Sequence, residues 1–317
     1  MVKKGFFIMS MVQYGLWPNC TNNCDFCLLS DRVYKTKEER LRLLDAIKEN
    51  IRDISWDGKF SDGISLLGGE VFYTEFDEIK DSFLDLIDII IKHIFAQSIN
   101  ARLSVVSNGI YDPNILLIPT IEKLKQNEVL DRFDLNFSYD FKYRFHTEES
   151  RLQAISNINM VYNKYNIIPC VQTCLTQYLI DMHLKDNFNI FDFQKNNFPN
   201  SILTFLYPHK INTGKTLPDF FFTRVSLMGF IKWMKKNDHI KEIENFIKSV
   251  INSSQFKYTG LFYRGDILEN GEEQDKEKHQ KPTLEKKQIL TDCGHSQLYR
   301  CYSDCDKCML CDLLKVV

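Results

Sequence analysis

Residues 20–27 read Cys20-Thr-Asn-Asn-Cys24-Asp-Phe-Cys27, which is the spacing C-x3-C-x2-C. Three thiols this close together can hold three corners of a cubane iron–sulfur cluster. No fourth cysteine lies near them in the sequence, so one iron could keep an open position for a reactive ligand, as a catalytic zinc does. A zinc site that takes its fourth ligand from a distant residue is the alternative that this spacing leaves open.

Around the cysteine triplet, short apolar runs alternate with stretches of helical periodicity. The runs that read as buried strands are Phe6–Tyr14, Gly63–Leu67, Arg102–Val106, Phe133–Ser138, Ile167–Leu175 and Ile202–Tyr207. Repeated strand–helix units predict a parallel sheet with helices outside it. About six units are too few for a closed eight-unit barrel, so we expect an α/β fold, a partial (β/α)6 TIM-like barrel.

Capping signals and apolar spacing place the helices between these strands. Thr36 and Glu39 form a capping box at the start of the first helix. A helix over Glu148–Tyr165 is predicted to turn one apolar face inward, formed by Leu152, Ile155, Ile158, Tyr162 and Tyr165. Residues 176–201 read as an irregular polar stretch. Two further helices are expected after the last strand, over Pro218–Lys236 and His239–Ile251.

Several polar motifs follow directly after predicted strands. Gly68-Gly69-Glu70 comes after the second strand, Ser107-Asn108-Gly109 comes after the third, and Ser138 ends the fourth. The cysteine triplet follows the first strand. In folds of this class the carboxyl ends of parallel strands meet at one edge, where the chemistry collects. We therefore expect these motifs to form one site.

In this order, the motifs resemble the radical S-adenosylmethionine (radical SAM) superfamily over roughly residues 5–210. Its signature has an aromatic residue before the last cysteine, a place that Phe26 fills. The resemblance implies that Cys20, Cys24 and Cys27 hold a [4Fe–4S] cluster whose open iron binds S-adenosylmethionine. It also implies reductive cleavage to methionine and a 5′-deoxyadenosyl radical, which takes a hydrogen atom from a substrate. Flavodoxin or ferredoxin is the electron donor that we expect.

The resemblance assigns the glycine-rich motif to cofactor binding. Gly68 and Gly69 would let the backbone approach S-adenosylmethionine closely, and backbone acceptors or Glu70 would bind its ammonium group. Val71 stands where the family often has a proline, which removes no polar contact. By itself a Gly-Gly-Glu sequence is more often a turn than a site. Its position after the second strand, one strand–helix unit after the cysteine triplet, favours a binding site.

The later motifs are assigned in the same way. Ser107 and Asn108 would reach the ribose or methionine end of the cofactor, and Ser138 matches the serine of a serine–x–aspartate element. Arg151, preferred to Arg144, would bind the methionine carboxylate through a charge-assisted contact. An ordinary Asn-Gly turn and a solvated arginine at a helix end are the alternatives.

A second group of cysteines lies near the end of the chain. It consists of Cys293, Cys301, Cys305, Cys308 and Cys311. Relatives with cysteine-rich extensions favour an auxiliary iron–sulfur cluster, while C-x2-C pairs are also typical of structural zinc. Cys170 and Cys174 share one face of a predicted strand. They read as small buried hydrophobic residues, or as a contact with the substrate if that face lines the barrel.

Composition narrows the function classes. With a net charge of −2, the chain gives no reason to expect nucleic acid as a partner. No apolar run is long enough to span a bilayer, and cysteines grouped in this way suit the reducing cytoplasm.

We expect a barrel over residues 1–215 and, over 216–317, a helical region, a charged linker and a cysteine-rich segment. The cysteine-rich segment favours a peptide or protein substrate. A nucleoside, RNA or small metabolite is the alternative, and a zinc-binding interaction protein is the rival that is not an enzyme.

Overall fold

The computed structural model describes residues 11–22, 24–27, 35–53, 63–186, 188–206, 217, 219–246 and 262–263. Within these ranges one sheet carries seven strands in the order β6-β5-β4-β3-β2-β1-β7, and every pairing is parallel. The strands are β1 (Met11–Gly15), β2 (Gly63–Leu67), β3 (Arg102–Ser107), β4 (Phe133–Ser138), β5 (Cys170–Cys174), β6 (Ile202–Leu206) and β7 (Phe262–Tyr263). The first six follow one another across the sheet in chain order, which confirms the predicted open, partial barrel.

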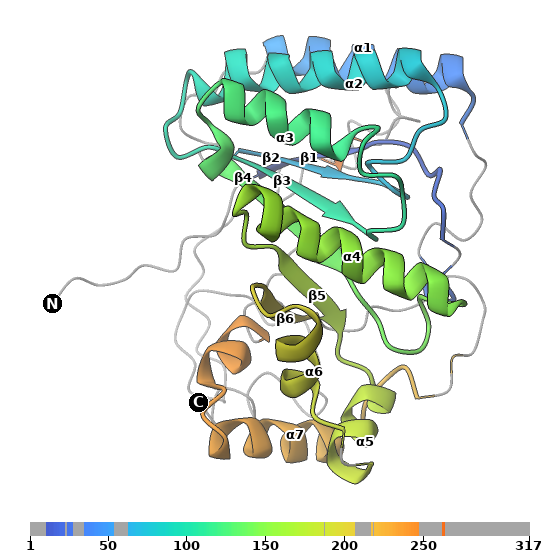
Figure 1. Cartoon of the computed structure of the whole chain (residues 1–317), viewed down its shortest axis with the longest axis vertical. Coiled ribbons are helices and arrows are strands. Elements are labelled where there is room, and N and C mark those ends of the chain that lie inside the picture. Colours follow the sequence, from blue (N-terminus) through green and yellow to red (C-terminus); the bar gives the residue numbers. More distant parts are fainter. Residues whose placement is uncertain are drawn as a thin grey trace, which may run out of the picture.

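Helices connect successive strands and lie along the outside of the sheet (Figure 1). They are α1 (Lys37–Asp53), α2 (Asp77–Ile90) with its π-helical continuation η1 (Ile91–Phe95), α3 (Leu117–Gln126), the short η2 (Leu130–Arg132), α4 (Glu148–Tyr165), α5 (Gln177–Lys185), α6 (Ile190–Asn197) and α7 (Arg224–Lys236). The predicted capping box begins α1. The Glu39 N–H donates to Thr36 Oγ1 at 3.3 Å, and the Thr36 N–H donates to Glu39 Oε2 at 2.6 Å.

The two faces of the sheet differ, because successive side chains of a strand point to opposite sides. Leu103 and Val105 of β3 are buried in the core that the helices cover. Ser104 lies between them, is half-buried and faces the barrel interior. There, Asn136 Nδ2 of β4 donates to Ser104 Oγ at 3.1 Å. The interior of this open barrel is therefore partly polar, unlike the apolar layers that fill a closed one.

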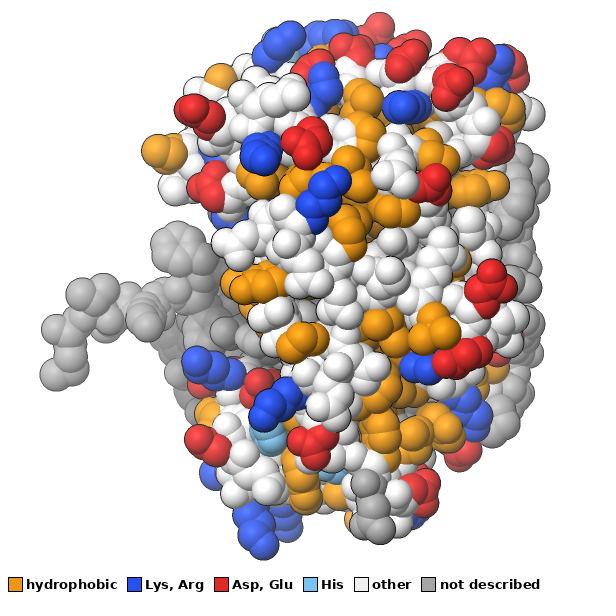
Figure 2. Space-filling model, viewed as in Figure 1, with side chains coloured by type: hydrophobic (Ala, Val, Ile, Leu, Met, Phe, Trp, Pro, Cys, Tyr) orange, Lys and Arg blue, Asp and Glu red, His pale blue; other side chains and the backbone are white. Residues whose placement is uncertain are grey.

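The outer surface mixes both signs of charge. Figure 2 shows lysine, arginine, aspartate and glutamate side chains interspersed over one face of the molecule, in keeping with the net charge of −2. No helix within the described ranges is long and apolar enough to cross a bilayer.

Two helices replace the irregular polar stretch predicted between β5 and β6. The side chain of Thr176 accepts from the Leu179 N–H at the start of α5, and Asn189 does the same for Phe191 in α6. These caps satisfy amide groups that have no partner within the helix. The prediction missed them because short helices with a narrow apolar face show little periodicity.

The predicted inner face of α4 was partly wrong. Ile158 and Tyr165 are buried as expected, but 52% of the surface of Leu152 is exposed, while Asn157 is buried. Asn157 Nδ2 donates to the carbonyl oxygens of Gly109 and Tyr111 at 2.9 and 3.0 Å. A buried asparagine is stable there because the loop after β3 supplies its acceptors.

Helix α7 begins later than predicted, at Arg224, with Thr223 as its N-cap. It packs against α5: the Thr223 N–H donates to Gln177 Oε1, and Gln177 Nε2 donates to Ser226 Oγ, both at 2.9 Å. The apolar side of α7 belongs to the same core as the sheet. The boundary between a barrel and a C-terminal region at 215 stays a prediction.

Candidate functional site

The segment that leads into the cysteine triplet runs beside the segment after β2. Leu16 donates its N–H to Leu67, Gly69 donates to Trp17, and Glu70 donates to Asn19, each to a carbonyl oxygen at 2.8 Å. These bonds extend the pairing of β1 and β2 beyond the sheet. The glycine motif therefore positions the backbone immediately before Cys20.

Both glycines of this motif are required by close approach. A Cβ on Gly69 would lie 2.2 Å from the carbonyl oxygen of Pro18, and one on Gly68 would lie 2.8 Å from that of Trp17. Both contacts are with backbone atoms that have little room to move. The lack of a side chain thus lets the two segments meet.

The carboxylate of Glu70 joins the end of β2 to the end of β3. Its Oε2 accepts from the Asn108 N–H at 2.6 Å and from Ser107 Oγ at 3.2 Å, and its Oε1 accepts from the Phe72 N–H at 3.0 Å. Burial raises the pKa of Glu70 to about 7, although these hydrogen bonds oppose the rise. Its backbone oxygen also accepts from Trp17 Nε1 at 2.9 Å. The hydrogen bonds of Glu70 thus hold the ends of β2 and β3 together.

Asn108 faces the cysteine loop rather than open space. Its Oδ1 accepts from the Ile110 N–H at 2.7 Å, and its Nδ2 lies 3.2 Å from Cys20 Sγ. Ser107 Oγ accepts from the Gly109 N–H at 3.0 Å, in a turn where Gly109 has a φ of +76°. The structure therefore brings the third-strand motif to the first cysteine.

The cysteine loop is anchored at several points. Asn22 donates to two sulfurs: its backbone N lies 3.4 Å from Cys20 Sγ, and its Nδ2 lies 3.4 Å from Cys24 Sγ. The Cys27 N–H donates to the Cys24 oxygen at 3.2 Å, and the Thr21 hydroxyl donates to a carbonyl of the loop after β3. The described ranges hold no group of three His, Cys, Asp or Glu side chains around one ion position. In a cubane, each of three thiolates binds a different iron.

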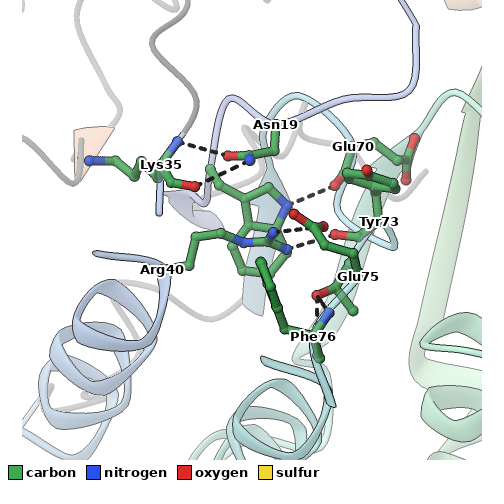
Figure 3. Close-up of polar contacts among 9 residues, drawn as sticks. Asn19, Lys35, Arg40, Glu70, Tyr73, Glu75 and Phe76 are labelled. Atoms are coloured by element: carbon green, nitrogen blue, oxygen red, sulfur yellow. Dashed lines mark hydrogen bonds and ion pairs between the residues drawn. The ribbon is translucent and has the colours of Figure 1, made fainter. Parts of the chain in front are cut away.

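A buried arginine supports this loop from α1 (Figure 3). The Arg40 guanidinium lies 4.3 Å from the centre of the Trp17 ring, and its Nη2 donates to the Tyr73 oxygen at 2.8 Å. Asn19 exchanges two hydrogen bonds with the backbone of Lys35, at 3.1 and 3.3 Å. None of these contacts was predicted from the sequence. The sequence did hold a sign of the role of Arg40, because helical spacing puts this charged residue on the same face as the buried Leu43, Leu44 and Ile47.

The end of β4 contributes charged groups. Asp140 is buried, and its Oδ1 accepts from the Lys142 and Tyr143 N–H groups at 3.0 and 2.7 Å. Burial raises the pKa of Asp140, although these two hydrogen bonds and then the charge of Arg144 oppose the rise. Ser138 is half-buried on the inner face, in register with Gln172 of β5.

The two candidate arginines lie in different surroundings. Arg151 bonds Glu148 in the first turn of α4, with 2.7 Å between Nε and Oε2. Arg144 lies against the cysteine loop, 5.2 Å from the centre of the Phe26 ring. Its Nε is buried and has no hydrogen-bond partner among the described residues. Arg144 thus lies beside the cysteine triplet through Phe26, and the role of Arg151 toward the cofactor stays a prediction.

Cys170 and Cys174 share the inner face of β5, as predicted. Cys170 Sγ donates to Thr204 Oγ1 at 3.3 Å. It lines a cavity of about 350 Å³ at the amino ends of the strands, with Arg102, Ser104, Asp134, Leu135, Asn136, Ile168 and Ile202. Burial raises the pKa of Cys174, the charge of Asp140 raises it further, and the charge of Arg144 lowers it. Cys174 is therefore the cysteine of β5 near the carboxyl edge. Cys293, Cys301, Cys305, Cys308 and Cys311 lie outside the described residues.

Comparisons with known proteins give one family. The model of the radical SAM superfamily matches residues 14–169. The chain is similar to SuiB of Streptococcus suis, solved with S-adenosylmethionine bound, at 15% identity and a TM-score of 0.45. That similarity covers 74% of this chain and 48% of SuiB, so it spans about half the length of SuiB. No curated protein matches the sequence.

Proposed function

The chain belongs to the radical SAM superfamily of enzymes, and we propose that Cys20, Cys24 and Cys27 hold its [4Fe–4S] cluster. When bound, the cluster and S-adenosylmethionine supply an electron transfer that cleaves the sulfonium to methionine and a radical that takes hydrogen from the substrate. The protein binds these groups, orients them and keeps water away.

The observation that carries this proposal is the position of Asn108. Its backbone N–H donates to Glu70 at 2.6 Å, and its amide reaches Cys20 Sγ at 3.2 Å. One residue after β3 therefore contacts both the glycine motif after β2 and the triplet after β1. An isolated Asn-Gly turn would have no reason to make these contacts.

The donor set fits the cluster and the amino acid part of its ligand. Three thiols with buried N–H donors nearby suit iron–sulfur ligation. The buried Nε of Arg144 has no partner in the described part of the chain. We assign the Arg144 guanidinium to the methionine carboxylate. Because the Glu70 oxygens already accept hydrogen bonds, we assign the ammonium to backbone oxygens of Gly68 and Gly69.

Aromatic side chains shield the site. Phe26 stacks on Phe220 with 5.5 Å between ring centres, and Tyr143 meets Phe220 edge-on at 5.7 Å. Phe220 is buried, although it lies far from the triplet in sequence. Apolar rings beside the cysteine loop exclude water, which would otherwise quench reactive species.

The substrate proposed is a peptide or protein. Its support is the sequence of the cysteine-rich segment 293–311, which we propose to bind a second iron–sulfur cluster. Flavodoxin or ferredoxin is the proposed electron donor. The polar inner face of the barrel is compatible with a substrate that offers amide groups.

Cluster assembly tests the ligand assignment. We expect anaerobic reconstitution with iron and sulfide to give a brown protein whose reduced EPR signal changes when S-adenosylmethionine is added. Cys24→Ala should lose the signal that responds to S-adenosylmethionine, whereas the matched change Cys170→Ala should keep it. A colourless wild-type protein that holds only zinc would contradict the proposal.

A further inference from the structure

Two buried asparagine amides point at cysteine sulfurs in this structure. We propose that Asn22 and Asn108 raise the reduction potential of the cluster by donating N–H···S hydrogen bonds to Cys24 and Cys20. This inference rests on the proposed function, in which these cysteines are cluster ligands. It assigns to Asn108 a role toward the cluster in place of the expected contact with the ribose or methionine of the cofactor.

The orientation of the Asn108 amide follows from its other contacts. Its Oδ1 accepts from the Ile110 N–H at 2.7 Å, so the NH2 group must be the end that faces Cys20 Sγ at 3.2 Å. Its backbone N–H is held by Glu70 at 2.6 Å. Asn108 is also buried. The donor is therefore fixed before the cluster binds, and it loses little entropy on making this bond.

Asn22 supplies two separate donors. Its side-chain Nδ2 lies 3.4 Å from Cys24 Sγ, and its backbone N lies 3.4 Å from Cys20 Sγ. Asn22 is buried like Asn108. A substitution of its side chain removes the first donor and leaves the backbone donor. The two asparagines therefore act on different sulfurs and can be tested separately.

The direction of the effect follows from electrostatics. One-electron reduction by flavodoxin, ferredoxin or a chemical reductant adds a negative charge, which is shared between the irons and the ligand sulfurs. An N–H dipole aimed at a sulfur stabilises the reduced cluster more than the oxidised one. The effect is larger in a buried site, where water does not screen it. Hydrogen bonds to the sulfurs are among the features that set the potentials of iron–sulfur clusters.

The test is a redox titration of the reconstituted protein without substrate. A separate sample first identifies the EPR signal that changes when S-adenosylmethionine is added. The titration then follows that signal in protein without S-adenosylmethionine. Asn108→Leu and Asn22→Leu should each make one-electron reduction about tenfold less favourable, which is 59 mV toward negative potential. Asn108→Asp keeps the shape and the acceptor for Ile110 but loses the donor, and it should shift the potential at least as far.

Asn157→Leu is the matched control. Asn157 is also buried and also holds the loop after β3, through the oxygens of Gly109 and Tyr111. Among the described residues Asn157 bonds carbonyl oxygens and no sulfur, so its substitution should leave the potential unchanged even if the protein is less stable. The potential is a property of those molecules that hold a cluster, so lower cluster occupancy does not alter the result.

The outcomes separate this inference from the proposed function. A reducible cluster with the same potential in wild type, Asn108→Leu and Asn108→Asp would overturn the inference and leave the ligand assignment standing. An equal shift in Asn157→Leu would also overturn it, because the cause would then be loop structure. A wild-type protein that forms no reducible cluster would contradict both proposals.

Discussion

The carboxylate of Glu70 accepts a hydrogen bond of 2.6 Å from the backbone N–H of Asn108, which joins the carboxyl ends of β2 and β3. This bond lies at the centre of the candidate site. Asn108 also donates a hydrogen bond to Cys20, and the backbone of Glu70 is hydrogen-bonded to Trp17 and Asn19. Substitutions around it are therefore expected to affect both stability and cluster binding.

Glu70 is expected to make stability depend on pH. Burial raises its pKa from 4.5 to about 7, so the folded state binds more protons than the unfolded state between these values. Its contribution is complete below pH 4.5 and is lost as the pH rises through 7, with a total on the order of 3 kcal/mol. Denaturant unfolding of the cluster-free protein at a series of pH values measures this loss.

Glu70→Gln should flatten that profile, whereas Glu149→Gln, on the exposed start of α4, should not. The same pH profile in wild type and Glu70→Gln would show that another group is responsible.

Gly69→Ala should destabilise the protein by about 1–3 kcal/mol, since the added Cβ would lie 2.2 Å from the Pro18 oxygen. The same change at Gly229 in α7 places the Cβ 3.4 Å from Leu184 Cδ1, and helix propensity then favours alanine by about 0.5–1 kcal/mol. Urea unfolding compares the two variants. If both changes have the same effect, close approach of the two segments is not what requires glycine.

Arg40→Ala should lower the free energy of unfolding by about 2–4 kcal/mol. It removes the stack on Trp17 and the hydrogen bond from Arg40 Nη2 to the Tyr73 oxygen. Arg40→Lys should recover only part of this loss, because an ammonium lacks the planar surface for stacking. Arg42→Ala, at an exposed position of the same helix, should change stability by less than about 0.5 kcal/mol. A similar loss in both alanine variants would refute the support that we assign to Arg40.

Arg144 and Arg151 can be separated by ligand affinity. If Arg144 binds the methionine carboxylate, Arg144→Ala should weaken binding of S-adenosylmethionine by about 10- to 100-fold. Arg151→Ala should have little effect, because Arg151 bonds Glu148 in α4. Calorimetric titration of the reconstituted enzyme measures both. Weaker binding in Arg151→Ala alone would restore the assignment made from the sequence.

The sequence could predict the order of the strands and the edge where the motifs meet, because strand periodicity and motif position are local properties. It could not predict where side chains at that edge point. Glu70 and Asn108 were expected to contact a cofactor, which stays a prediction, and the structure adds that each bonds a residue that follows another strand. On α4, Leu152 was expected to be buried and is exposed, whereas Asn157 is buried. The sequence of the helix does not show this, because the acceptors of Asn157 come from the loop after β3.

Arg40 and α5 illustrate two further limits. A charged residue on an apolar helix face is stable only if tertiary partners exist, and Trp17 and Tyr73 lie far from Arg40 in sequence. Helix α5 depends on its Thr176 cap and on packing against α7 rather than on its own periodicity. Tertiary contacts decide both cases.

The central claim is that the cysteine triplet supports cleavage of S-adenosylmethionine. Its most direct test is the amount of 5′-deoxyadenosine formed by the reconstituted protein with dithionite and S-adenosylmethionine under anaerobic conditions, measured by mass spectrometry. We predict product from wild type and none above background from Cys24→Ala. Equal amounts from the two proteins, or none from a wild-type protein that holds its cluster, would contradict the account.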